Sequence, residues 1–352
     1  MKRPSILFAL ALFGSLLFAE SEIRFDALPV PVSNSAITSV RVSGQILVFS
    51  SMGIGVNKTW DAVTNSTYVL NTSYGKWTEI RQGPGSVGRV GAAAAGLHEQ
   101  AYILGGFVVD DQGRESAVAD AELYDPINRK WYRIPDVPIG VADAVAGVYR
   151  DRYIYLVSGW SATGAVNAVQ IYDVEKQEWL KGTPVPGEPV FGHAGTIVGD
   201  TIIYVDGARK NSTAGGLPYI SSPDCWMGKI DRKNPTHIEW TKLPEHPGTA
   251  RFHIAAGGSE KDGRVYFSGG SENPYNYKGI GLDGKPVEAS PLTFAYNLRT
   301  SKWESINENT PNPTLDSRFV LVTPGKLVII GGLDKDQVTA RVNEVAKVAK
   351  AK

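Results

Sequence analysis

The chain has 352 residues, and its 36 lysine and arginine residues balance 36 aspartate and glutamate residues. A net charge of zero argues against a general nucleic-acid or membrane-surface binder, because such proteins need a field of one sign. The single cysteine, Cys225, excludes an intramolecular disulfide, and 38 glycine and 21 proline residues favour many short strands joined by turns.

The first residues are typical of a secretory signal. Lys2 and Arg3 form a charged start, an apolar run extends from Ile6 to Phe18, and Ala19 suits the position before a cleavage site. The apolar run is too short to span a bilayer comfortably. We therefore expect residues 1–19 to be removed and the mature chain to be periplasmic or secreted, without membrane insertion.

A repeat organises the rest of the chain. Five tryptophans each precede a glycine by 28 to 30 residues, and Phe25 stands 28 residues before Gly53 in the same relation. The tryptophan and glycine pairs are Trp77 and Gly106, Trp131 and Gly159, Trp179 and Gly207, Trp240 and Gly270, and Trp303 and Gly332. A repeat of about fifty residues predicts one array of similar units instead of several unrelated domains.

Each unit reads as four short strands. In the second unit these are a small-residue run over 91–97, an apolar run over 101–106, a third run over 121–125 and a fourth containing Trp131. Leu70, Tyr124, Tyr172 and Tyr296 each lie seven residues before a tryptophan, which indicates a regular pairing of the third and fourth strands. Such units cannot bury both faces alone, so they must stack around an axis.

These features predict an all-β, six-bladed propeller that forms a single domain over residues 20–352. The N-terminal segment 23–29 resembles a fourth strand and its exit turn, while residues 338–348 supply a third strand. We expect both to belong to the last blade, which the N-terminal strand would close, because closure removes exposed sheet edges. We also expect a monomer.

The units resemble kelch repeats. The resemblance rests on Gly-Gly pairs at 105–106, 269–270 and 331–332, on weaker forms at 52–53, 158–159 and 206–207, and on the tyrosine and tryptophan positions. It implies a kelch-type propeller over nearly all of the mature chain. It leaves the activity open, because kelch propellers include enzymes, sugar binders and protein-docking modules.

Loop lengths indicate where a ligand would bind. The distance from each repeat glycine to the next tryptophan is 24, 25, 20, 33 and 33 residues, so the loops between second and third strands vary most. These loops share a face with the loops between blades, and variable loops on a constant scaffold are common binding sites. In the fifth unit, Tyr275, Asn276 and Tyr277 suit a sugar; alternatively, the two tyrosines anchor the loop to the propeller.

The starts of the first strands provide a second group of candidates around the axis. The expected ring contains Arg89, His193, Arg251, His253 and Arg318, with Asn34 and Asp143 in the remaining blades. Three arginines at one axis would attract a carboxylate or an acidic protein segment. The alternative is that each arginine pairs with a local carboxylate such as Asp316 or Glu245.

Candidate catalytic residues are His193, His253 and Glu272. A histidine titrates near neutrality and can transfer protons, but a lone buried histidine more often binds a backbone carbonyl. No pair of histidines has metal-ligand spacing, so we expect no metal and no cofactor.

These residues bear on three candidate functions. The chain resembles the exported six-bladed enzymes that epimerise N-acetylneuraminate, but Ala208 and Arg209 occupy the place after Gly207 where that family is associated with an acidic residue. Glu272 would have to substitute for it. A galactose-oxidase-like copper enzyme is rejected, because Cys225 and the histidines lack the expected partners. We therefore expect a module that binds a small anionic or carbohydrate ligand, or an acidic protein segment, on its loop face; the alternative is a sugar epimerase or mutarotase.

Overall fold

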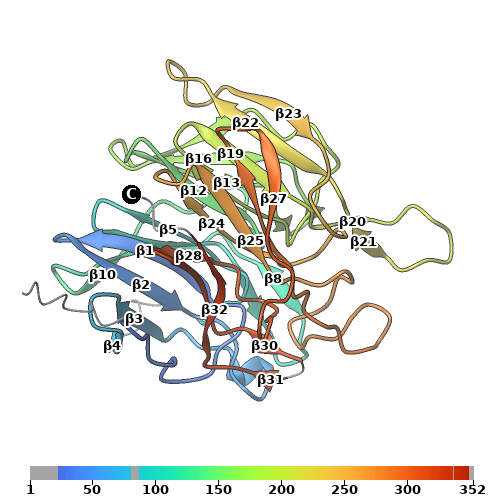
Figure 1. Cartoon of the computed structure of the whole chain (residues 1–352), viewed down its shortest axis with the longest axis horizontal. Coiled ribbons are helices and arrows are strands. Elements are labelled where there is room, and N and C mark those ends of the chain that lie inside the picture. Colours follow the sequence, from blue (N-terminus) through green and yellow to red (C-terminus); the bar gives the residue numbers. More distant parts are fainter. Residues whose placement is uncertain (1–22, 81–86, 336, 349–352) are drawn as a thin grey trace, which may run out of the picture.

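The computed structural model describes residues 23–80, 87–335 and 337–348. Over these residues six blades are built from strands close in sequence: five are four-stranded antiparallel sheets and the last is a three-stranded sheet, while a second three-stranded sheet and three two-stranded sheets lie in the loops. The first strands of neighbouring sheets contact one another, as β1 does with β5 and β18 with β24, and thus surround a common axis (Figure 1). The expected all-β propeller is confirmed.

The strands of each blade follow one another in the order of the sequence. They are β1 (Ala36–Val42), β2 (Gln45–Ser51), β3 (Thr67–Asn71) and β4 (Lys76–Ile80); β5 (Ala93–Leu97), β6 (Gln100–Leu104), β9 (Ala121–Asp125) and β10 (Lys130–Arg133); β12 (Val145–Tyr149), β13 (Tyr153–Val157), β16 (Val169–Asp173) and β17 (Glu178–Gly182); β18 (Ala194–Val198), β19 (Thr201–Val205), β22 (Cys225–Ile230) and β23 (Ile238–Leu243); β24 (Ala255–Ser259), β25 (Arg264–Ser268), β26 (Thr293–Asn297) and β27 (Lys302–Asn307); and β28 (Leu321–Thr323), β29 (Lys326–Ile330) and β32 (Val342–Lys347).

Short elements decorate the loops between second and third strands. They are the 3-10 helix η1 (Trp60–Ala62), β7 (Phe107–Val109) and β8 (Glu115–Ala117), β14 (Trp160–Ser161) and β15 (Gly164–Ala165), β20 (Ala208–Lys210) and β21 (Tyr219–Ser221), and β30 (Leu333–Asp334) and β31 (Gln337–Val338); β11 (Val141–Ala142) precedes the third blade. The hairpin of β20 and β21 projects furthest from the body in Figure 1.

The repeated tryptophans connect neighbouring blades. Trp179 donates its indole N–H to the carbonyl of Pro135 at 2.8 Å, in the turn that leaves the preceding blade. Trp303 does the same to Pro244 at 2.8 Å. The seven-residue spacing also has its expected meaning, because Tyr172 lies directly opposite Trp179 and Tyr296 opposite Trp303 in adjacent strands. Burial between blades forms the core, as where Tyr155 and Tyr204 pack in one cluster.

The last blade differs from expectation at its edge. Its third strand, β32, comes from the C-terminal stretch as expected and pairs with β29. Residues 23–28 adopt no regular strand; the Leu28 amide donates to Ala340 at 2.8 Å and the Asp26 amide to Gly75 at 2.8 Å. The segment therefore joins the last blade to the first through isolated hydrogen bonds, and residues 1–22, with the expected signal, lie outside the described residues.

Candidate functional site

The two kinds of loop lie on one face of the propeller, as expected. In each blade the segment before the first strand pairs with the loop after the second strand. The pairs are Ser33 with Ile54, Val90 with Phe107, Val141 with Ser161, Phe191 with Ala208, Phe252 with Ser271, and Leu315 with Leu333. This pairing fixes the backbone of the loop face around the axis, so side chains from several blades converge there.

A ring of residues with left-handed backbone surrounds the axis just beneath that face. Their φ angles are 54° at Asn34, 64° at Gly91, 55° at Asp143, 62° at Gly192, 56° at His253 and 57° at Asp316. Glycine, asparagine and aspartate tolerate this conformation best. Backbone hydrogen bonds join ring members, including Asp143 to Gly91 and His253 to Gly192, both at 2.8 Å.

The side chains of this ring form a buried network of charges. Nδ1 of His253 lies 2.6 Å from Oδ1 of Asp316, and its Nε2 lies 3.2 Å from Oδ2 of Asp143. Arg318 donates through Nη1 to Oδ1 of Asp143 at 2.6 Å, and Tyr275 donates its hydroxyl to Asp316 at 3.0 Å. The network fastens the fifth-blade loop that carries Tyr275 to the axial ring.

Burial and charge act against each other in this network. Burial disfavours the charged imidazolium of His253, but the adjacent Asp143 and Asp316 carboxylates outweigh it and raise the pKa of His253. Burial likewise opposes ionisation of Asp143, yet His253 and Arg318 hold the pKa of Asp143 well below its usual range. The floor of the site therefore places His253 and Arg318 against the carboxyl groups of Asp143 and Asp316.

Above this floor lies a pocket of about 290 Å³. Seven aromatic side chains line it: Phe107, Trp160, Phe191, Tyr219, Phe252, Tyr275 and Tyr277. Its polar lining consists of Asn34, Glu115, Asp143, His253 and Asn276. We call this cavity the loop-face pocket. Its volume is near the lower end of small-molecule sites, which are mostly apolar with a few placed polar groups.

The aromatic wall has edge-to-face geometry. The ring centroids of Trp160 and Phe191 lie 4.7 Å apart, those of Phe191 and Tyr219 5.3 Å apart, and those of Phe191 and Phe252 5.4 Å apart. Trp160, Phe191 and Tyr219 are only partly buried. Flat, partly exposed rings held in fixed orientations can stack on the apolar face of a ligand at small entropic cost.

Glu115 brings a titratable group to the pocket. It lies on β8, within the hairpin of the second blade, and remains accessible from the pocket. Glu115 is exposed by surface area, but the protein packed near its carboxyl group, together with the charge of Asp143, raises the pKa of Glu115 to about 7. A carboxyl group with this pKa can donate or accept a proton at neutral pH.

The expected ring of three arginines does not form. Arg89 is buried within the second blade, where it donates to the carbonyls of Gly105 and Asp120 at 2.8 Å and lies 3.3 Å from Glu122. Arg251 is equally buried and donates to the carbonyl of Gly269 at 2.9 Å. Both side chains point from the starts of the first strands into the blade interior. Of the three arginines, Arg318 alone lines the cavity that the first strands enclose along the axis.

Two catalytic candidates also lie apart from the loop-face pocket. His193 is buried, and its Nε2 lies 2.9 Å from the carbonyl oxygen of Val157; burial lowers the pKa of His193 to about 3. It therefore remains neutral near pH 7. Glu272 is exposed and accepts a hydrogen bond from Thr249 at 2.7 Å, and it is absent from the lining of the pocket. His253 is the candidate that does reach the pocket.

The structure places the fifth-blade residues at the pocket and buries their two tyrosines, while their binding of a sugar stays a prediction. Tyr275, Asn276 and Tyr277 all line the pocket. Both tyrosines are also buried, with 6% and 7% of their surface exposed, so they anchor the loop as well. Tyr277 packs with Phe107 and Val109 of the second blade, which carries this loop across the axis.

The sequence did not reveal several pocket residues. Trp160 and Phe191 occupy repeat positions that hold smaller residues in some other blades, as Ala208 and Val90 show. Tyr219 belongs to the long fourth-blade loop that the spacing singles out, whereas Glu115 stands in a short hairpin of the second blade. Phe191 and Phe252 share one usable signal. Each lies one or two residues before a histidine at the start of a first strand, and each pairs with the loop of its own blade. Glu115 carries no signal of this kind.

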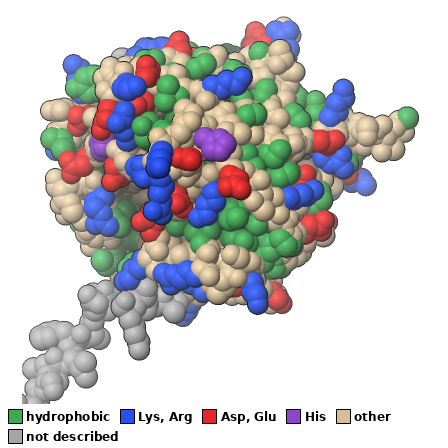
Figure 2. All heavy atoms as spheres, turned by 90° about the horizontal axis from the view of Figure 1, so that it is seen from above, with side chains coloured by type: hydrophobic (Ala, Val, Ile, Leu, Met, Phe, Trp, Pro, Cys, Tyr) green, Lys and Arg blue, Asp and Glu red, His purple; other side chains and the backbone are tan. Residues whose placement is uncertain are grey.

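Over the described ranges, the structure contains no helix long and apolar enough to cross a membrane. On the face shown in Figure 2, charged side chains of both signs are interspersed, in keeping with the balanced composition.

The fold defines a β-propeller, and residues 88–138, within and around the second blade, match the family model described as the kelch motif. The chain is 28% identical over 287 residues to Kelch-like protein terF of Aspergillus terreus, covering 78% of this chain and 56% of that protein. It is 23% identical to N-acetylneuraminate epimerase of Haemophilus influenzae, covering 94% of both chains. The solved structure of YjhT superposes with a TM-score of 0.70 at 18% identity, covering 90% of this chain and 95% of that one.

Proposed function

We propose that this chain is an exported propeller that binds a single sugar ring in the loop-face pocket. The observation that carries the proposal is the combination of seven aromatic side chains with a few polar groups in about 290 Å³. Aromatic rings suit the apolar face of a sugar, while Asn34, Asn276 and Glu115 can pair with its hydroxyl groups. The similarity to N-acetylneuraminate epimerase supports a sugar as the ligand, although the sugar in that name is acidic, unlike the one proposed here.

The charges of the pocket favour an uncharged or amine-bearing sugar. Among the described lining residues, Glu115 and Asp143 are acidic, and neither lysine nor arginine is present. A sugar carboxylate would meet these groups without a pairing cation beyond His253, which both floor carboxylates already hold. An acidic protein segment would face the same repulsion.

Anomer exchange is the second candidate function, and the raised pKa of Glu115 favours it. In this reaction a base takes the proton of the anomeric hydroxyl, the ring C–O bond breaks and the ring oxygen gains a proton; reversal closes either anomer. A carboxyl group that titrates near pH 7 suits such proton transfer. Glu115 would perform the role for which the sequence offered Glu272.

Calorimetric titration tests the binding proposal. The purified chain is titrated with neutral hexoses, N-acetylhexosamines, amino sugars, and sialic and uronic acids. We expect neutral or amino sugars to bind and Trp160→Ala to weaken that binding at least tenfold, as loss of a stacking ring does. Trp60→Ala is the matched control, because Trp60 is exposed on η1 and does not line the pocket. Binding of acidic sugars alone would overturn the assigned ligand class.

A further inference from the structure

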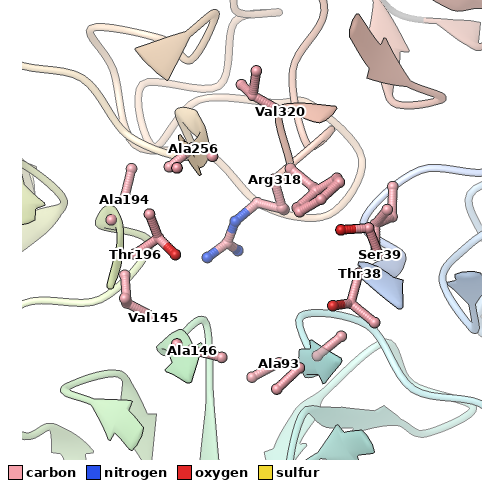
Figure 3. Close-up of a pocket in the computed structure, with 18 of the residues that line it drawn as sticks. Thr38, Ser39, Ala93, Val145, Ala146, Ala194, Thr196, Ala256, Arg318 and Val320 are labelled. Carbon is pink, nitrogen blue, oxygen red and sulfur yellow. The ribbon is translucent and has the colours of Figure 1, made fainter. Parts of the chain in front are cut away.

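A second cavity follows the propeller axis on the opposite side of the ring. It also measures about 290 Å³, and residues of the first strands of all six blades line it. It shares no lining residue with the loop-face pocket. The side chains on its walls are small, including Ala93, Ala146 and Ala194, because six first strands meet at the axis (Figure 3). We call this cavity the axial channel.

Arg318 supplies the charge of the axial channel. Among the described lining residues it is the only one that is permanently charged, since burial lowers the pKa of His193 to about 3. No lysine, aspartate or glutamate is among the described residues of the wall. Figure 3 shows the guanidinium of Arg318 extending into the open centre of the channel.

Within the described part of the chain, most hydrogen-bond donors of Arg318 have no protein acceptor. A guanidinium carries five N–H groups, and the side chain of Arg318 makes one hydrogen bond, from Nη1 to Asp143 at 2.6 Å. Asp143 also lies 3.2 Å from His253, so its negative charge is shared between two cations. The side chain of Arg318 is 15% exposed, which leaves its other nitrogens open to the channel.

The walls provide further polar groups without negative charge. Thr38, Ser39 and Thr196 line the channel, and Figure 3 shows their hydroxyl groups near the open centre. Hydroxyl groups can donate to an anion, and a narrow channel with one sign of charge concentrates the opposite sign. A small oxyanion would satisfy donors of Arg318 that the protein leaves open.

We propose that the axial channel binds a small oxyanion, a carboxylate or an inorganic phosphate, through the guanidinium of Arg318. The site is separate from the loop-face pocket and does not depend on the proposed sugar binding. Of the three arginines that the sequence predicts at the axis, Arg318 would thus bind an anion, on the side of the axis away from the loop face.

Calorimetric titration of the purified chain with sodium phosphate and with sodium acetate tests this site. Ionic strength is held constant with the sodium salt of a bulky sulfonate buffer. We expect saturable binding of at least one of the two anions. Arg318→Met should weaken it at least tenfold, because a charge-assisted hydrogen bond is lost. Arg209→Met is the matched control, since Arg209 pairs with Glu188 on the loop face.

A second variant tests the site without breaking the contact between Arg318 and Asp143. Ala146→Leu fills part of the channel, because Ala146 lies on its wall. We expect it to fold and to bind the anion at least tenfold more weakly, while Trp160→Ala binds it as the wild type does. The proposal fails if neither anion binds the wild-type chain, or if Ala146→Leu binds with unchanged affinity.

Discussion

The hydroxyl of Tyr275 donates to Oδ1 of Asp316 at 3.0 Å, and Nδ1 of His253 approaches the same oxygen at 2.6 Å. One buried carboxylate thus connects the fifth-blade loop to the ring of left-handed residues around the axis. Loops that carry binding residues are usually mobile, but this loop is tied to the scaffold at its centre. Its anchoring should therefore be measurable.

Tyr275→Phe should destabilise the chain while leaving its fold intact. The phenolic donor serves an ionised acceptor, and loss of such a hydrogen bond costs roughly 1.5–3 kcal/mol. Urea unfolding should show this decrease in the free energy of unfolding, and limited proteolysis should cut within residues 271–292 sooner. Tyr277→Phe is the control, because Tyr277 packs similarly but has no hydrogen bond from its hydroxyl in the described part of the chain. Equal effects of both substitutions would contradict the anchoring role.

Gly192→Ala should be strongly destabilising. Gly192 has φ of +62°, and an added Cβ would lie 2.0 Å from Cε2 of Phe252. The left-handed backbone and the overpacking together should cost roughly 2–5 kcal/mol. Gly199→Ala separates the two causes, because Gly199 has φ of +60° and nothing within 4 Å of an added Cβ. Thermal unfolding should therefore rank the wild type first, Gly199→Ala second and Gly192→Ala last.

Arg89 and Arg251 occupy equivalent places in two blades, but only Arg89 has a buried carboxylate partner. We therefore predict an energetic coupling between Arg89 and Glu122. The guanidinium of Arg89 lies 3.3 Å from Glu122, whereas that of Arg251 lies 5.1 Å from the ring centroid of Phe294. Glu122→Met should cost roughly 3–5 kcal/mol, because it leaves a buried cation without its carboxylate. The double variant Arg89→Met with Glu122→Met should be closer to the wild type. A double-mutant cycle on urea unfolding measures the coupling, and additive effects would refute it.

His193 should make the chain sensitive to acid. Its pKa is lowered by burial to about 3, against about 6.5 in the unfolded chain. Between these values the unfolded state binds a proton that the folded state does not, so stability falls as the pH falls from about 6.5 to 3. The slope should approach about 1.4 kcal/mol per pH unit for one proton. His193→Gln should flatten the pH dependence of the free energy of unfolding, measured by urea unfolding at several pH values. An unchanged slope would mean that other groups cause the loss of stability in acid.

The repeat predicted the blades because it records contacts between neighbours. Each tryptophan occupies a fixed place opposite the third strand, and the indole of Trp303 reaches back to Pro244 of the preceding blade. The arginine ring was wrong because a side chain two residues before the left-handed position points into the blade, as Arg89 does, whereas Arg318 points to the axis. Sequence spacing contains no information on that direction. Glu115 was missed because its environment comes from other blades.

The titration of Glu115 offers a direct test of the loop-face pocket. Its pKa is raised to about 7 by the surrounding protein and, secondarily, by Asp143. NMR titration of the carboxyl carbon should give this value in the wild type, and Asp143→Asn should move it toward the ordinary range for glutamate. If Glu115 acts as the acid in anomer exchange, the rate should fall as the pH rises through about 7, where its proton is lost. Glu115→Gln should abolish that exchange but retain sugar binding. A pKa near that of an ordinary glutamate would remove the chemical basis for the exchange while leaving the binding proposal to the calorimetric test.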